Sequence, residues 1–186
     1  MTTIRQAALV LPLFAALNAA SAVEVAEMTY RPDAETTPKP LVQNCAINVA
    51  LSDGRTNRDT IGRIDITESV VAGDMLPWLG AVVDRLSAYG YTVVHGAPGG
   101  GGVNVEVRLT RAYTFYVPGH LGGMLALEVA VPGRATPVKI RGAKLRPWRN
   151  WGGAANHVAA LNGAADGVVD DLAKALSQVC PGVPAA

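Results

Sequence analysis

The chain has 186 residues, with 16 basic and 15 acidic side chains and a formal net charge of +1 at pH 7. A general nucleic-acid-binding protein needs a strong basic excess, so this balance argues against that class. The length is sufficient for one domain with a hydrophobic core.

The amino-terminal segment predicts a secretory signal peptide. Arg5 supplies a short positive region, and residues 7–17 form an apolar run that is too short to span a bilayer. Small residues precede Val23, so we expect cleavage between Ala22 and Val23. The mature protein is then expected to be periplasmic or secreted, soluble and not membrane-spanning. Since no cysteine follows the predicted cut, no lipid anchor is expected.

The next segment, residues 23–44, contains three prolines and several charges, which disfavour a helix or an inner strand. We predict an extended linker here. Residues 45–51 then alternate between two faces and predict the first strand. After a polar turn, residues 61–66 alternate again and predict a second, short strand.

A helix is predicted between Asp74 and Gly90. The Asp74 carboxylate can accept hydrogen bonds from the free amides of the first turn, and Pro77 lies where a missing amide hydrogen costs nothing. An apolar stripe begins at Leu79, and Gly90 ends the helix because glycine adopts positive φ without strain. Residues 91–94 then predict a strand.

Three strands are predicted in the following part of the chain. Residues 103–109 alternate most clearly between apolar and polar side chains. The run continues to residue 117, but Arg111 breaks the alternation, which predicts a bulge or a sheet edge there. Residues 121–131 and 138–145 follow after Pro-Gly turns, so the three strands are expected to form an antiparallel meander.

The last predicted element is a helix over residues 154–179, whose apolar residues recur at alternating spacings of three and four. The order of elements predicts an α+β fold with a mainly antiparallel sheet, a three-strand meander and two helices packed on one face. The predicted organisation is a signal peptide 1–22, an extended linker 23–44, a single domain 45–180 and a tail 181–186.

The chain has two cysteines, Cys45 at the start of the first predicted strand and Cys180 at the end of the last helix. In an exported protein such a pair indicates one disulfide, and two free buried thiols are the alternative. The bond would hold the final helix against the first strand.

Patterns for metal and nucleotide binding are weak. The glycine-rich loop 96–102 lacks a Gly-Lys-Ser/Thr ending and leads into a strand, which favours a hairpin connection over a phosphate site. His95, His120 and His157 are too widely spaced for a local metal site, which favours surface histidines. We predict no metal and no cofactor.

Catalytic patterns are equally weak. No Gly-x-Ser-x-Gly elbow is present. Asp53 and Asp59 could form an acid–base pair, but Arg55 and Arg58 lie between them, which favours a structured charged turn. We therefore predict no catalytic residues and expect that the protein is not an enzyme.

A basic segment is the main candidate for binding. Between Glu128 and Asp166 the chain has no acidic residue and six basic ones: Arg134, Lys139, Arg141, Lys144, Arg146 and Arg149. We predict that Lys139, Arg141, Lys144 and Arg146 form an exposed positive strip that binds anionic lipid head groups, lipopolysaccharide or an acidic partner. The alternative is an edge strand that is protected by its charge and only solvated.

Aromatic residues supply further surface candidates. Trp148 lies close to Arg146 and Arg149 in the sequence, and with Trp151 it suits an interface anchor. A core position is the alternative for both tryptophans. The other aromatic candidates are Tyr113, Phe115 and Tyr116.

Two short patterns carry a family resemblance. Residues 49–55 followed by Ile61-Gly62 contain an Asp-x-Arg motif, and residues 86–93 contain a Leu-x-x-x-Gly-Tyr motif. With the hairpin and the tryptophan before a long final helix, the chain resembles the YajG-like envelope lipoproteins over Cys45 to Val179. It is more distantly similar to auxiliary lipoproteins of ABC-type lipid transporters. The resemblance implies an α+β envelope domain without known catalytic residues.

Three functions remain open from the sequence. The first is a non-catalytic exported domain that docks on an envelope protein partner or an anionic envelope surface, or acts as a transport or assembly accessory. The second is a small-molecule or lipid-binding carrier with a pocket between sheet and helices, which a pocket above roughly 300 Å³ would favour. The third is a hydrolase with an assembled site, whose nucleophile and base the sequence does not identify.

Overall fold

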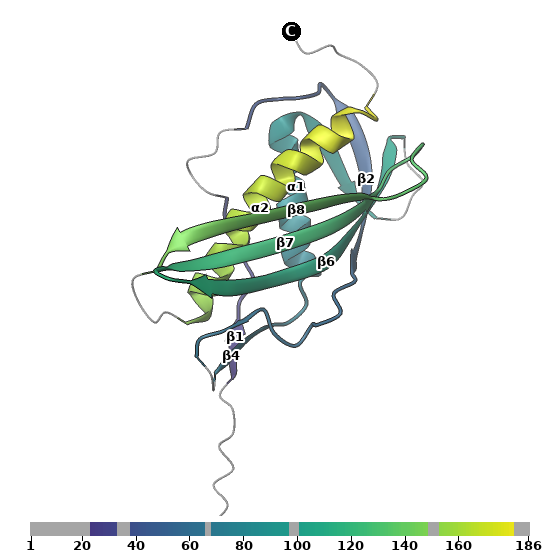
Figure 1. The fold of residues 1–186 in the computed structure, drawn as a ribbon. Coiled ribbons are helices and arrows are strands. Elements are labelled where there is room, and N and C mark those ends of the chain that lie inside the picture. The colour runs from purple at the N-terminus through teal and green to yellow at the C-terminus, as the bar shows by residue number, and fades with distance from the viewer. Residues whose placement is uncertain (1–22, 33–37, 66–67, 97–100, 149–152, 181–186) are drawn as a thin grey trace, which may run out of the picture.

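The computed structural model describes residues 23–32, 38–65, 68–96, 101–148 and 153–180, so the predicted signal peptide and tail lie outside the described residues. The fold in Figure 1 is α+β. Its elements, in chain order, are β1 (Val23–Ala26), β2 (Cys45–Asp53), β3 (Gly62–Arg63), β4 (Ser69–Ala72), α1 (Leu76–Asp84), the 3₁₀ helix η1 (Arg85–Tyr89), β5 (Tyr91–His95), β6 (Val103–Val117), β7 (His120–Ala130), β8 (Val138–Pro147) and α2 (Ala154–Ser177).

The larger sheet has five strands in the order β5-β2-β6-β7-β8. The predicted meander is confirmed, because β6, β7 and β8 pair antiparallel in sequence. The prediction of a mainly antiparallel sheet is wrong, since β2 pairs parallel with both β5 and β6. The loop 96–102 is therefore not a hairpin connection: it joins two strands that lie on opposite sides of β2. Alternation predicts that a strand exists, but it carries no information on direction or neighbours.

The smaller sheet was not predicted and has the order β1-β4-β3, with β1 parallel to β4 and β3 antiparallel to it. It changes the interpretation of the segment 23–44, for which the sequence predicts only an extended linker. Ala26 and Val42 are buried, and the Tyr30 hydroxyl donates a hydrogen bond of 2.6 Å to Asp166 on α2. The described parts of this segment therefore pack on the domain.

Both helices cover one face of the five-stranded sheet, as predicted, and Figure 1 shows α1 and α2 behind the strands. The sheet contributes Ile47, Val105 and Leu127 to the core between the layers, and α2 contributes Leu161 and Leu172, all at most 1 % exposed. Burial of each such side chain contributes about 1.5–3 kcal/mol. α2 approaches the meander closely where Gly123 and Gly142 face it, because neither residue carries a side chain.

The first helix follows its predicted signals. Asp74 accepts a hydrogen bond of 2.9 Å from the Leu76 amide, and Pro77 lies in the first turn. The helix continues as the tighter 3₁₀ helix η1, and the helical segment ends at Gly90. The φ of 93° at Gly90 is the left-handed conformation predicted for this stop. Among the described residues, no helix is long and apolar enough to cross a bilayer.

The predicted disulfide is confirmed. Cys45 at the start of β2 is bonded to Cys180 beyond α2, with a Cα–Cα distance of 5.9 Å and a sequence separation of 135 residues. A second contact between distant segments, buried and polar, lies in the amino-terminal half of α2. Asn162 accepts a hydrogen bond of 2.9 Å from the Trp78 indole and donates one of 3.0 Å to the Thr29 carbonyl, so one side chain joins α2 to α1 and to the amino-terminal segment.

Candidate functional site

The face of the meander that points away from the helices is not covered by any described element. We call the surface formed there by β6, β7 and β8 the open face. The cross-strand register places on it the pair Glu106–Ala130 and the rows Arg108–Glu128–Lys139, Arg111–Ala126–Arg141, Tyr113–Met124–Ala143 and Phe115–Gly122–Leu145.

The predicted bulge determines which residues of β6 reach this face. The register between β6 and β7 shifts between Leu109 and Arg111, so Arg111 pairs with Ala126, two residues from Glu128. Residues two apart on a strand share a face, and Arg111 therefore joins Arg108 on the open face. Without the bulge, strict alternation would place Arg111 on the opposite face.

The first two rows form what we call the basic cluster: Arg108, Arg111, Lys139 and Arg141. These side chains and Glu128 line a shallow hollow of about 320 Å³. The Glu128 carboxylate lies 3.8 Å from both Arg108 and Lys139. The side chains of Arg111 and Arg141 make no hydrogen bond or ion pair within the part of the chain that the structure describes. Four cations and one carboxylate thus line the hollow, and with Glu106, two residues before Arg108 on the same face, the surface still carries more positive than negative charge.

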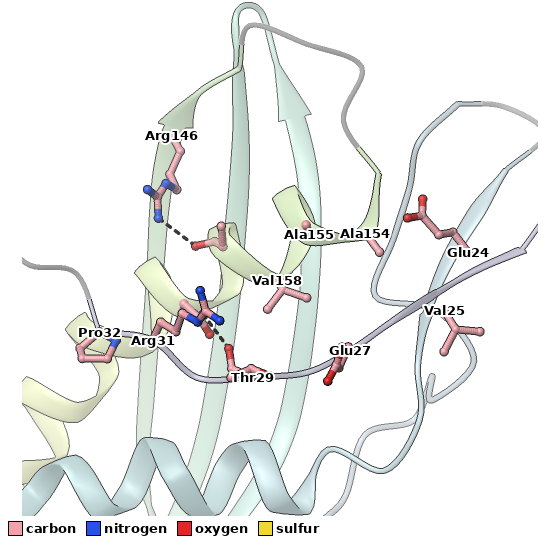
Figure 2. Close-up of a pocket in the computed structure, with 12 residues that line it drawn as sticks. Glu24, Val25, Glu27, Thr29, Arg31, Pro32, Arg146, Ala154, Ala155 and Val158 are labelled. Atoms are coloured by element: carbon pink, nitrogen blue, oxygen red, sulfur yellow. Dashed lines mark hydrogen bonds between the residues drawn. The ribbon is translucent and has the colours of Figure 1, made fainter.

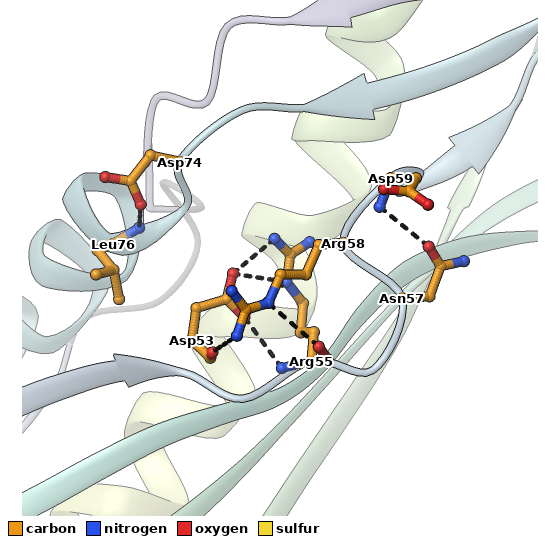
Figure 3. Close-up of polar contacts among 7 residues, drawn as sticks. All are labelled: Asp53, Arg55, Asn57, Arg58, Asp59, Asp74 and Leu76. Atoms are coloured by element: carbon orange, nitrogen blue, oxygen red, sulfur yellow. Dashed lines mark hydrogen bonds and ion pairs between the residues drawn. The ribbon is translucent and has the colours of Figure 1, made fainter.

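The loop after β2 closes one side of the basic cluster. Gly54 packs directly against the Arg108 side chain, and a Cβ at this position would overlap the guanidinium. The neighbouring Asp53 and Arg55 form an ion pair of 2.8 Å whose side chains are 13 % and 2 % exposed. Figure 3 shows this pair, with Arg58 beside it. The hydrogen bonds from Arg55 hold the pKa of Asp53 below its usual value, so the pair stays ionised and supports the predicted structured turn.

The other two rows form what we call the apolar patch: Tyr113, Phe115, Met124, Ala143 and Leu145. Tyr113 is 37 % exposed and Leu145 is 49 % exposed. The Tyr113 and Phe115 rings lie 6.2 Å apart at a tilted angle. An antiparallel sheet with one solvated face normally carries polar residues there, so a group of apolar side chains beside a basic cluster is unusual.

The predicted positive strip does not form one surface. Lys139 and Arg141 lie in the basic cluster, but β8 keeps an unbroken register, so Lys144 and Arg146 point to the opposite face. There Lys144 packs against Gly163, and Arg146 donates a hydrogen bond of 3.2 Å to the Ala159 carbonyl on α2. The prediction of one continuous strip is wrong because odd-numbered and even-numbered residues of this strand point to opposite faces of the sheet.

Of the predicted anchors Trp148 and Trp151, only Trp148 lies among the described residues. Trp148 packs on the Tyr116 ring with a centroid distance of 4.7 Å, on the helix side of β6. Arg149 and Trp151 lie outside the described residues. The sequence interpretation did not include Arg108 and Arg111 among the candidate binding residues. The signal that could have identified them is the hairpin register, which pairs β6 with β7 and β7 with β8.

His157 is not a surface histidine, and that prediction is wrong. It lies fully buried in the first turns of α2, against Thr114 and Tyr116. The Thr114 hydroxyl donates to the Ile61 carbonyl, so it accepts from His157 Nδ1 at 2.6 Å. Burial lowers the pKa of His157 below its ordinary value, and the nearby Glu24 charge partly opposes this effect. The buried imidazole is therefore neutral and joins α2 to β6.

This histidine makes stability depend on pH. The pKa is lower in the folded state than the value of about 6.5 in the unfolded chain, so the unfolded state binds more protons below that pH. We expect the free energy of unfolding to fall as the pH is lowered from 7 through 6.5, until the folded pKa is reached. Chemical denaturation at several pH values should show this slope, and the His157→Gln variant should lack it. An unchanged slope in the variant would assign it to other groups.

The described residues contain no cluster of three histidine, cysteine or acidic side chains that could hold a metal ion. What the arrangement offers instead is binding: a basic cluster and an apolar patch on one uncovered sheet face, and a separate pocket beside α2. Among the described residues, no group on the open face is placed to act as a nucleophile with an adjacent base.

The comparisons with known proteins give only a distant structural likeness. No known family model matches the sequence, and no curated protein matches it. Solved structures with a similar arrangement include a Xanthomonas campestris protein assigned to the family DUF330, with a TM-score of 0.48 and 13 % identity over 85 % of this chain and 97 % of that one. Another is an uncharacterized protein, with a TM-score of 0.47 and 13 % identity over 84 % of this chain and 99 % of that one.

Proposed function

We propose that this protein is a non-catalytic exported domain that docks on an anionic surface of the cell envelope through its open face. The observation that carries the proposal is the adjacency of the basic cluster and the apolar patch on a sheet face that neither helix covers. The predicted signal peptide and the disulfide between Cys45 and Cys180 support an exported, oxidising location. The sequence resemblance to YajG-like envelope lipoproteins supports the same setting.

The chemistry of this face suits an anionic lipid surface. Each Lys or Arg near such a surface contributes about 1 kcal/mol of attraction, and the cluster offers four cations against one carboxylate. The exposed Tyr113 and Leu145 can enter the head-group region, where an aromatic ring with a polar edge is favoured. The two groups lie in neighbouring rows of one sheet face, so a single surface can contact both at once.

Charge reversal on the open face tests this proposal. The double variant Arg111→Glu, Arg141→Glu is expected to bind vesicles of phosphatidylglycerol and phosphatidylcholine at least about tenfold more weakly at low salt, because each reversal replaces attraction by repulsion. Co-sedimentation of the chain from Val23 onward measures the effect. Binding of the unmodified protein should weaken as salt is raised, since salt screens exposed charges.

A matched control uses cations on the opposite face of the same strand. The variant Lys144→Glu, Arg146→Glu carries the same change in net charge, and we expect it to keep most of the vesicle affinity. Equal losses in the two variants would assign binding to net charge and not to the open face. No binding of the unmodified protein to anionic vesicles would contradict an anionic lipid surface and leave an acidic protein as the docking partner to test.

A second candidate is a small-molecule carrier. The observation that favours it is a pocket of about 610 Å³ beside α2, which exceeds the roughly 300 Å³ expected of a ligand site. This pocket shares no lining residue with the basic cluster, so the two functions can be tested separately.

A further inference from the structure

The pocket beside α2 is formed by segments far apart in the sequence. Its floor is the stripe Ala155, Val158 and Ala159 on α2, and its walls are the segment from Glu24 to Pro32 and the end of β8 at Arg146. Figure 2 shows these side chains around the pocket. The floor is mainly apolar, with Asn162 as the polar side chain that α2 adds, and the walls carry the charges.

The walls carry two acidic and two basic side chains: Glu24, Glu27, Arg31 and Arg146. In the view of Figure 2, Arg31 and Arg146 lie toward one end of the pocket and Glu24 toward the other. Within the described residues, the side chains of Glu24, Glu27 and Arg31 make no hydrogen bond or ion pair, and the Arg146 guanidinium donates its hydrogen bond to the Ala159 carbonyl. Charges of both signs thus line one pocket without pairing with each other.

The acidic end has a structural partner of its own. The Glu24 carboxylate lies against Gly153, the residue that precedes α2, and a Cβ at Gly153 would overlap it. A helix amino terminus attracts negative charge, so Glu24 already has a favourable site. Glu27 is exposed and lacks such a contact, which makes it the acidic group most available to a ligand.

The amino-terminal wall also offers backbone groups. In the described sheet, β1 pairs only with β4 and is therefore an edge strand. An edge strand has backbone amides and carbonyls that can pair with an added extended chain. Glu24 and Val25 of β1 line the pocket on the far side of Glu27 from Arg31, so a ligand that spans Glu27 to Arg31 would run beside residues 27–31, which follow β1.

We propose that this pocket binds a short peptide with free termini, with its carboxylate at Arg31 and Arg146 and its ammonium group at Glu27. The proposal rests on the carrier function and names its ligand class. Glu27 and Arg31 are four residues apart on a segment without helical structure, which corresponds to about 13 Å when extended. An extended tetrapeptide spans a similar length, and small side chains would contact the apolar floor.

Isothermal titration of the oxidised chain from Val23 onward with tetra-alanine tests the proposal. We expect the free peptide to bind, and either amino-terminal acetylation or carboxyl-terminal amidation to weaken binding at least about tenfold, because each removes one charge pair. The variants Arg31→Gln and Glu27→Gln should each bind the free peptide more weakly than the unmodified protein does. Arg111→Gln, on the open face, serves as the control and should leave binding unchanged.

A cycle of variants and blocked peptides assigns each end. Arg31→Gln should not further weaken binding of the amidated peptide, because that peptide has no carboxylate to pair with Arg31. Glu27→Gln should likewise not further weaken binding of the acetylated peptide, which has no ammonium group to pair with Glu27. Equal binding of the free peptide and of a peptide blocked at both ends would overturn the proposal. So would the absence of binding up to about 10 mM.

Two further ligands separate this inference from the carrier function. Glycerophosphoethanolamine is a zwitterion derived from a lipid head group, with its charges closer together, and tighter binding of it than of tetra-alanine would overturn the peptide assignment. Laurate carries only a negative charge. One outcome is that laurate binds to the unmodified protein and more weakly to Arg146→Gln, while the peptide does not bind. In that outcome the carrier function stands and the peptide class is wrong. If none of the three ligands binds, both are wrong.

Discussion

Replacing Cys45 and Cys180 together by serine is expected to lower the free energy of unfolding by about 4–5 kcal/mol, more than any other substitution proposed for this chain. The bond closes a loop with a sequence separation of 135 residues, so its loss frees the unfolded chain over nearly the whole domain. It also releases the end of α2 from the start of β2. Net stabilities of many domains are of the same size, so the variant should be only marginally folded.

Thermal unfolding measures this effect, with an expected decrease in Tm of more than about 10 °C for a chain of this length. The unmodified protein treated with reductant is the control, and it should unfold at the same temperature as the double variant. A single Cys45→Ser variant should match both. A variant that unfolds at the temperature of the oxidised protein would show that the bond contributes no stability.

Replacing Gly123 by alanine is expected to cost about 3 kcal/mol or more, because a Cβ at this position on β7 has no room. It would overlap the Ala160 carbonyl and lie 2.8 Å from the Leu161 amide nitrogen, both on the backbone of α2. Backbone atoms of a packed helix cannot rotate away as a side chain can, so the helix must move off the meander. Urea unfolding of Gly123→Ala should show the loss as a lower midpoint.

Two other glycines supply controls. Gly122 is the neighbouring residue on the open face, where the three atoms nearest to an added Cβ all belong to the ring of Phe115, a side chain that can rotate. Gly122→Ala should therefore cost much less. Gly167 lies on the exposed side of α2, and a methyl group added there would meet nothing within 4 Å, so Gly167→Ala should stabilise the helix by up to about 1 kcal/mol. Equal effects at Gly122 and Gly123 would contradict the close approach of α2.

Sequence patterns predicted those parts of the fold that depend on local chemistry. The first helix began near Asp74 and ended at Gly90 because capping and backbone preference act within a few residues. The bulge before Arg111 was visible as a break in alternation. The cysteine pair could be predicted because the chain has only two.

The other parts depend on pairing between distant segments. β1 and β4 have only four residues each, too few for a clear period, and they are stabilised by pairing with each other. The burial of His157 depends on Thr114 and Tyr116, which reach it from β6. Neither contact leaves a signal in the local sequence.

The candidate site was half predictable. The period of two along a strand places Lys139 and Arg141 on one face and Lys144 and Arg146 on the other, as the register of β8 shows. Arg108 and Arg111 reach the cluster only through the register of the β6–β7 hairpin and its bulge. The apolar patch depends on the same register, because its residues come from three strands.

The central claim is that the open face is the docking surface, and fluorescence from a tryptophan placed on it tests this claim most directly. The variant Tyr113→Trp puts a reporter in the apolar patch, and Thr92→Trp puts one on β5, at the far edge of the same sheet. Both are compared with the unmodified protein during titration with phosphatidylglycerol vesicles that contain brominated acyl chains. We predict a blue shift and quenching for Tyr113→Trp and no added response for Thr92→Trp. Vesicle binding without any response at position 113, or with an equal response at both positions, would contradict the claim.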